Sequence, residues 1–193
     1  MKNKLIARSV IALIAVIALL AVRWDRVELE SRAFALCLML DTDNGGYIAA
    51  ASIADNKKVI EGGEEPSYIK KANGQTLKAA IESLLCEGEF CKVYLGHTMA
   101  IIINEALLSN QDELLQALKH LEDENEVNIK AILLQTNEKF DELLSQNPKE
   151  APLGIYIAGV FKNVSIDLEL AIRLLSQGIE PNLHSINKEN LDG

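Results

Sequence analysis

Three histidines, His97, His120 and His184, are the side chains best suited to acid–base or metal chemistry near neutral pH, and they are isolated from one another in the sequence. His120 falls at the end of a predicted helix, where a cation is favourable against the helix dipole. His97 follows Gly96 between two apolar runs, and we interpret it as structural. No phosphate-binding loop, dinucleotide glycine fingerprint or Gly-x-Ser-x-Gly elbow accompanies them. The pattern therefore predicts no catalytic residue, no metal site and no cofactor.

The three cysteines are too few for a disulfide framework, and no Cys-x-x-Cys spacing suggests zinc. Cys86 and Cys91 flank the sequence Glu-Gly-Glu-Phe and are close enough to form a small disulfide loop in an oxidising compartment. The sequence leaves their redox state open. Cys37 lies in an apolar run and is predicted to be a small buried hydrophobic residue.

The charge of the chain is divided unevenly along its 193 residues. Residues 1–22 contain Lys2, Lys4 and Arg8 and no acidic residue, so they carry a charge of +3. Because the whole chain has a net charge of −9, residues 23–193 carry −12. Nucleic-acid binding needs clustered Lys and Arg side chains to contact phosphates. The acidic body of the chain therefore argues against a nucleic-acid partner.

The N-terminal segment combines this basic start with an unbroken apolar run from Val10 to Val22. Counted back to Leu5, the apolar stretch approaches the roughly 20 residues that span a bilayer. Basic residues before such a helix place its N-terminus in the cytoplasm and the rest of the chain outside. We favour an uncleaved anchor at residues 1–22 over a cleaved signal peptide, because small residues are poorly placed for cleavage. Residues 23–193 then form an extracytoplasmic domain.

The body alternates between strand-like and helix-like segments. An apolar run at 33–40, turn residues at 41–46 and a return at 47–54 predict a β-hairpin, followed by a polar loop at 57–67. Thr76 is expected to cap a helix that ends near Cys86. Further strands are predicted at 92–95, 99–103 and 127–135, and further helices from Asn110, after Thr136 or Asn137, at 153–164 and at 166–176. This order predicts an α+β fold in which helices pack on a mixed sheet.

A family resemblance begins directly after the apolar segment, at Trp24-Asp25-Arg26. An acidic stretch and an apolar strand ending at Asp41 follow, and later matches occur in the same order. These are Gly74-Gln75-Thr76-Leu77, Tyr94-Leu95-Gly96-His97, Ala100–Ile103, Asn128–Leu134, Pro152–Phe161 with Tyr156, and Gly178-Ile179-Glu180-Pro181. In this order and spacing the chain resembles the N-terminal domain of the Ger(x)C spore-germination proteins, the C subunits of nutrient germinant receptors in endospore-forming bacteria.

The resemblance implies a non-enzymatic membrane subunit on the outer face of the spore inner membrane. It also implies partners, a transporter-like A subunit and a multispanning B subunit. Family members carry a lipidated cysteine directly before the position of Trp24, where this chain has Arg23, so no lipidation is predicted and the apolar helix itself is the expected anchor. Members of the family also continue into further domains.

Trp24, Asp25 and Arg26 are the candidate contacts with a partner or with the membrane interface, because Trp favours the interface and the charged pair can bind a partner or lipid headgroups. An anchor girdle with first-turn capping is an equally good interpretation. Two hypotheses follow for function. The first is a germinant-receptor subunit that acts through protein–protein contacts. The alternative is a membrane-anchored envelope enzyme or small-ligand sensor of another class.

Overall fold

The chain divides into two compact units, Met1–Arg32 and Ala33–Gly193. The computed structural model describes residues 32–43, 45–54, 67–86, 92–123, 127–139, 142–143 and 151–191. The predicted anchor at residues 1–22 lies outside the described residues. Within the described part, no helix combines the length and the apolar character needed to cross a membrane.

The first two strands form the predicted hairpin. β1 (Arg32–Asp43) pairs antiparallel with β2 (Gly46–Ala54), in a register that runs from Phe34 opposite Ala54 to Asp43 opposite Gly46. The register shifts between Ala35 and Cys37, which marks a β-bulge at Leu36. A third strand, β3 (Ser67–Gly74), pairs antiparallel with the other edge of β2. The sequence did not predict β3, and most of the predicted loop before it lies outside the described residues.

The sheet is mixed, as the sequence predicted. Across the described ranges, its strand order is β3-β2-β1-β5-β6-β7, with β4 paired to β1 and β8 paired to β6. The central strand β5 runs parallel to both β1 and β6. The additional strands are β4 (Lys92–Tyr94), β5 (Ala100–Asn104), β6 (Ile132–Thr136), β7 (Ile166–Asp167) and β8 (His184–Ser185). Four of the five residues of β5 are fully buried, as expected for a strand covered on both faces.

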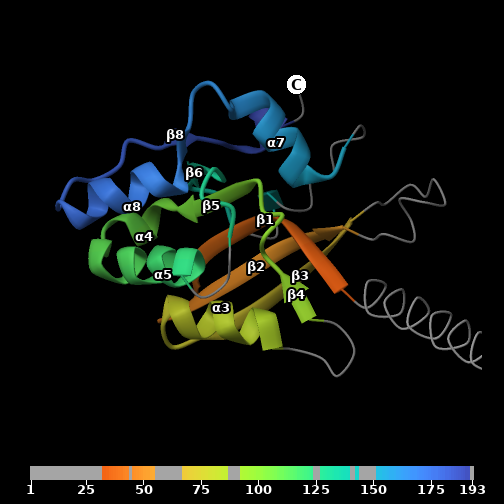
Figure 1. Cartoon of the computed structure of the whole chain (residues 1–193), viewed down its shortest axis with the longest axis horizontal. Coiled ribbons are helices and arrows are strands. Elements are labelled where there is room, and N and C mark those ends of the chain that lie inside the picture. Colours follow the sequence, from red (N-terminus) through yellow and green to blue (C-terminus); the bar gives the residue numbers. More distant parts are fainter. Residues whose placement is uncertain are drawn as a thin grey trace, which may run out of the picture. The chain divides into compact units, whose positions relative to one another are not determined.

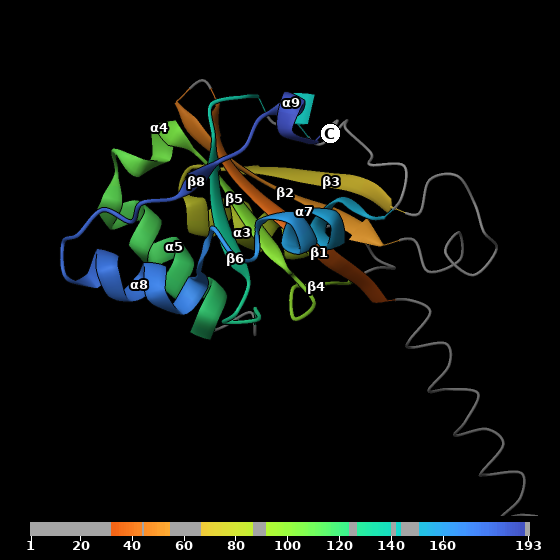
Figure 2. The same ribbon diagram turned by 90° about the horizontal axis from the view of Figure 1, so that it is seen from above.

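Helices cover both faces of this sheet (Figure 1). One core cluster joins the sheet to α3 (Leu77–Cys86), α5 (Gln111–Asp123) and α8 (Leu168–Ser176). A second cluster, on the other face, joins it to α7 (Leu153–Phe161) and α9 (Lys188–Leu191). A short helix, α4 (Glu105–Leu108), directly follows β5. The view in Figure 2 looks onto the face that carries α7 and α9.

Side-chain caps explain where several helices begin. The Thr76 hydroxyl accepts a hydrogen bond from the N–H of Ala79 (3.1 Å), as predicted. Glu113, in the first turn of α5, reaches across to accept from the N–H of Leu77 (2.8 Å), so its carboxylate also serves the start of α3. Ionisable first-turn residues can therefore stabilise two neighbouring helices at once.

Several predicted boundaries were wrong, each for a local reason. The strand expected from Val127 begins at Ile132, because Asn128 forms a turn in which its side chain accepts from the N–H of Lys130 (3.0 Å). The helix expected at 166–176 begins at Leu168, after the two residues of β7. The helix expected at 153–164 ends at Phe161. Of the helix expected after Thr136 or Asn137, residues 137–139 are described and are not helical, whereas residues 142–143 are helical. The elements α4, β8 and α9 were not predicted.

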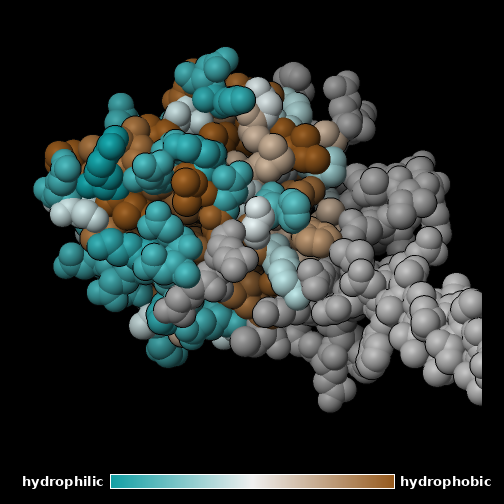
Figure 3. All heavy atoms as spheres, in the orientation of Figure 1, coloured by the Kyte–Doolittle hydropathy of each residue, from teal (hydrophilic) through white to brown (hydrophobic). Residues whose placement is uncertain are grey.

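Helix α7 lies close against the bulge of β1. A Cβ atom added to Gly154 would stand 2.2 Å from the carbonyl oxygen of Leu36, so only glycine fits at this contact. No residue of α7 carries a charge, and its outer side leaves Ile155 44% and Val160 52% exposed. Figure 3 shows apolar atoms gathered at the surface over this helix. α7 is therefore apolar on its exposed side as well as on the side that packs against the sheet.

Candidate functional site

The histidines take three different structural roles. The exposed ring of His97 meets Phe34 edge-on, with centroids 4.9 Å apart. His120 lies in the last turn of α5, as predicted, but its side chain is buried, with Nε2 3.7 Å from a carboxylate oxygen of Glu82 on α3. His184, on β8, lies beside the ring of Phe161. Among the described residues, no group of three or more His, Cys, Asp or Glu side chains is arranged to hold a metal ion.

Cys37 is buried at the centre of β1, which confirms its predicted role as a small hydrophobic residue. Burial raises the pKa of its thiol to about 12, so the thiolate that a nucleophile requires is strongly disfavoured. The redox state of Cys86 and Cys91, which the sequence left open, lies outside what the structure describes, since only the backbone of Cys86 is placed. The candidate contact residues Trp24, Asp25 and Arg26 and the position of Arg23 also lie outside the described residues.

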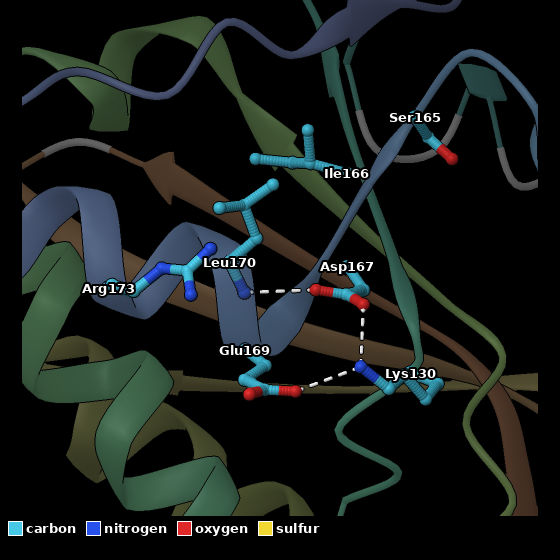
Figure 4. A pocket seen from close by; sticks show the side chains of 7 residues that line it. All are labelled: Lys130, Ser165, Ile166, Asp167, Glu169, Leu170 and Arg173. Carbon is cyan, nitrogen blue, oxygen red and sulfur yellow. Dashed lines mark hydrogen bonds and ion pairs between the residues drawn. The ribbon is translucent and has the colours of Figure 1, made fainter.

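A pocket of about 380 Å³ opens where the turn before β6 meets the start of α8 (Figure 4). Two basic and two acidic side chains line it, together with Ser165, Ile166 and Leu170. The charged residues are Lys130, Asp167, Glu169 and Arg173. Lys130 comes from the turn that follows Asn128, and the other three charged residues come from the β7–α8 segment.

Lys130 joins two carboxylates in this pocket. Its Nζ atom lies 3.0 Å from Asp167 Oδ2 and 2.8 Å from Glu169 Oε2. We call these three residues the lysine latch. The hydrogen bonds to Glu169 and then to Asp167 raise the pKa of Lys130. Partial burial acts to raise the pKa of Asp167, but the hydrogen bond from the N–H of Leu170 and the contact with Lys130 outweigh it and lower that pKa.

Backbone hydrogen bonds reinforce the latch. The N–H of Leu168 donates to the carbonyl of Ala131 (2.9 Å), and the N–H of Glu169 donates to that of Ile129 (3.3 Å). Asp167 Oδ1 accepts from the N–H of Leu170 (2.9 Å) as the helix N-cap. These three donors at the start of α8 are therefore already satisfied within the protein.

The chemistry of the latch is that of a structural connection. Lys130 is held protonated, so it lacks the free amine that a base or nucleophile needs, and Asp167 is held ionised by partners that it already contacts. The latch fixes the turn before β6 to the helix that covers it. It provides no support for the alternative hypothesis of an envelope enzyme.

Part of this arrangement had a sequence signal and part had none. An Asp followed by a Glu two residues later, before an apolar helical stripe, is typical of a helix N-terminus and indicates Asp167 as an N-cap. Starting the predicted helix at Ile166 obscured that signal. Lys130 is 37 residues from Asp167 in the chain, and no local pattern predicts their contact.

Comparison with protein-family models matches residues 25–172 to the spore germination protein N-terminal domain. The match covers about three quarters of the chain and ends within α8, so it includes helices on both faces of the sheet but neither β8 nor α9. Searches of curated proteins and of solved structures found no significant match. The family match agrees with the order of motifs described above, and it confirms the resemblance identified from the sequence.

Proposed function

Because this chain belongs to the family of spore germination protein N-terminal domains, we propose that it acts in a spore nutrient germinant receptor, as a membrane-associated and non-enzymatic subunit. The match over residues 25–172 is the observation that carries this proposal. The N-terminal apolar segment holds the domain at the outer face of the spore inner membrane. The domain then acts through contacts with A-type and B-type receptor subunits.

Two features of the chain support a binding role. The charged groups of the lysine latch contact one another and bind the fold together, which leaves them poorly suited to act on a substrate. The acidic body and the basic, apolar start of the chain suit a protein divided between a membrane and the space outside it. Within the proposal, Trp24, Asp25 and Arg26 are the first candidates for contact with a partner.

Affinity purification of the tagged full-length chain from spore membranes tests the proposal. We expect mass spectrometry to find A-type and B-type receptor subunits in the eluate, and intact-mass analysis to show residues 1–22 retained without lipid. Deleting the gene should also delay the loss of refractility that nutrients trigger. Recovery without receptor subunits, together with normal germination on every nutrient in a strain lacking paralogues, would contradict the proposal.

A pair of aromatic substitutions tests the candidate contacts. We expect Trp24→Ala to reduce co-purification of the receptor subunits, because Trp and its charged neighbours stand at the proposed membrane exit. Tyr68→Ala is a matched control, since Tyr68 is an exposed aromatic residue on the edge strand β3. Equal recovery of partners with both variants would remove Trp24 from the contact.

A further inference from the structure

One end of the sheet gathers partly exposed apolar and aromatic side chains from β1, β4, α7 and the loops before β5 and β6. The three parallel strands β1, β5 and β6 all start at this end. Met99, one residue before β5, is 39% exposed, and Ile129, three residues before β6, is 43% exposed. We call this the strand-start surface, and its members are Phe34, Tyr94, His97, Met99, Ile129 and Ile155.

Backbone contacts connect the segments that carry these residues. The N–H of Met99 donates to the carbonyl of Leu36 (2.9 Å), the same carbonyl against which Gly154 packs. The segments that carry Met99 and Ile155 therefore meet at the same backbone carbonyl. The carbonyl of Met99 in turn accepts a hydrogen bond from the N–H of Ile132 (3.0 Å). This bond places the turn containing Ile129 beside Met99 at the same end of the sheet.

Aromatic contacts extend the surface along the outer end of β1. Phe34 meets His97 edge-on and meets Tyr94 with ring centroids 6.1 Å apart. Tyr and His rings combine an apolar body with a polar tip, a combination suited to the boundary between lipid and water. Met and Ile supply purely apolar contact beside them.

The short connection to the N-terminal segment limits how far the strand-start surface can lie from a bilayer that holds this segment. Only nine residues, 23–31, separate the apolar run ending at Val22 from the start of β1 at Arg32. At 3.3–3.6 Å per residue, this connection cannot exceed about 35 Å. A bilayer that holds the N-terminal segment is thus always within reach of the strand-start surface, at a high effective concentration.

The charges around the surface are compatible with lipid headgroups. None of its six residues is acidic, although the chain after residue 22 carries a net charge of −12. Beside Ile129, the carboxylates of Asp167 and Glu169 are both in contact with Lys130. Lys130 thereby offsets one of the two negative charges at this end of the sheet.

We propose that the strand-start surface rests on the headgroup region of the bilayer into which the N-terminal segment inserts. This inference rests on the proposed membrane association and adds an orientation to it. The domain stands with the starts of β1, β5 and β6 toward the lipid and with the far end of α8 away from it. Side chains in such a position enter the interface by about 5–10 Å.

Tryptophan quenching in phosphatidylcholine vesicles, with bromine atoms near the headgroup end of the acyl chains, tests this orientation. The full-length chain has one tryptophan, Trp24, so a Trp24→Phe background accepts a single new reporter. We expect Met99→Trp to lose most of its emission in brominated vesicles relative to plain ones. Ile179→Trp, at a 49% exposed position after α8, should keep its emission.

The unmodified chain separates this inference from the proposed function. Quenching of Trp24 without quenching of Met99→Trp overturns the orientation alone, and quenching of neither overturns both proposals. Equal quenching of Met99→Trp and Ile179→Trp also overturns the orientation. If circular dichroism shows that Met99→Trp is unfolded, Ile129→Trp decides the question by the same readout. Protection of Met99→Trp only when receptor subunits are added would assign the surface to a protein partner instead.

Discussion

Gly154 and Gly159 lie on the same helix, α7, and differ in what a side chain would meet at each position. A Cβ at Gly154 would approach the backbone of Leu36 at 2.2 Å, whereas a Cβ at Gly159 has no neighbour within 4 Å. We expect Gly154→Ala to lower the free energy of unfolding by roughly 1–3 kcal/mol or more, because backbone atoms cannot move aside as a flexible side chain can. Urea denaturation followed by circular dichroism measures this change.

Gly159→Ala is the matched control for that substitution. We expect it to raise the free energy of unfolding by about 0.5–1 kcal/mol, because alanine favours the helix more than glycine does. If Gly154→Ala were as stable as Gly159→Ala, the close contact between α7 and the β1 bulge would not exist in solution.

The lysine latch predicts a dependence of stability on pH. The pKa of Asp167 is lowered in the folded state, so its contribution is present above the ordinary carboxyl pKa and is lost as the pH falls through the folded value. The pKa of Lys130 is raised, so its contribution is present below its ordinary pKa and is lost as the pH rises through the higher folded value. We expect Lys130→Met to lower the Tm most near neutral pH, and less toward either extreme.

Lys162→Met serves as the control for the latch substitution. Lys162 is an exposed lysine directly after α7, so its replacement removes the same charge without touching the latch. Thermal melts of both variants across the pH range separate the local contact from the change in net charge. A Tm difference between them that does not vary with pH would contradict the ion-pair interpretation.

At the scale of the element, the start of α8 depends on the N-cap as well as on the latch. We expect Asp167→Ala to destabilise the domain by about 0.5–2 kcal/mol, because the N–H of Leu170 loses its acceptor. Asp167→Asn keeps an acceptor at the same position and should retain most of that stability. Chemical denaturation of the two variants therefore distinguishes the cap from the charge, and equal losses would assign the whole effect to the ion pair.

Elements with a strong periodic pattern could be predicted, and those without one could not. The apolar run of β1 and the helical spacing of Leu77, Ile81 and Leu84 each mark a buried face, so the hairpin and α3 were predicted correctly. β3 is an edge strand with the polar sequence SYIKKANG, and an edge strand can form without a continuous apolar face. β7 and β8 have two residues each, too few to show any period.

The candidate site shows the same division. The type of α8 and its acidic start are local properties, but the latch depends on a contact between segments 37 and 39 residues apart. The side of α7 that faces the sheet likewise depends on Gly154 meeting the β1 bulge, which follows from the packing of two distant segments. Tertiary contacts of this kind have no local signal in one sequence.

At the scale of the whole molecule, Cys37 lies in the interior of the sheet, with a paired strand on either side. It sits on β1 between β2 and β5, beneath the cluster that includes α7, and its side chain is 1% exposed. A central strand of this kind opens only when the sheet itself opens, so its exposure should require global unfolding. The raised pKa, about 12, further suppresses the reactive thiolate in the folded state.

Alkylation of Cys37 in a Cys86→Ser, Cys91→Ser background tests this prediction. In native buffer we expect labelling to be far slower than that of a free thiol. With added urea, the rate should rise with the same slope that describes unfolding by circular dichroism, because both then report the same surface exposure. Rapid labelling without urea would mean that β1 separates from its neighbours while the rest of the domain stays folded. In that case α7 and β1 could not form the rigid strand-start surface on which the proposed membrane orientation depends.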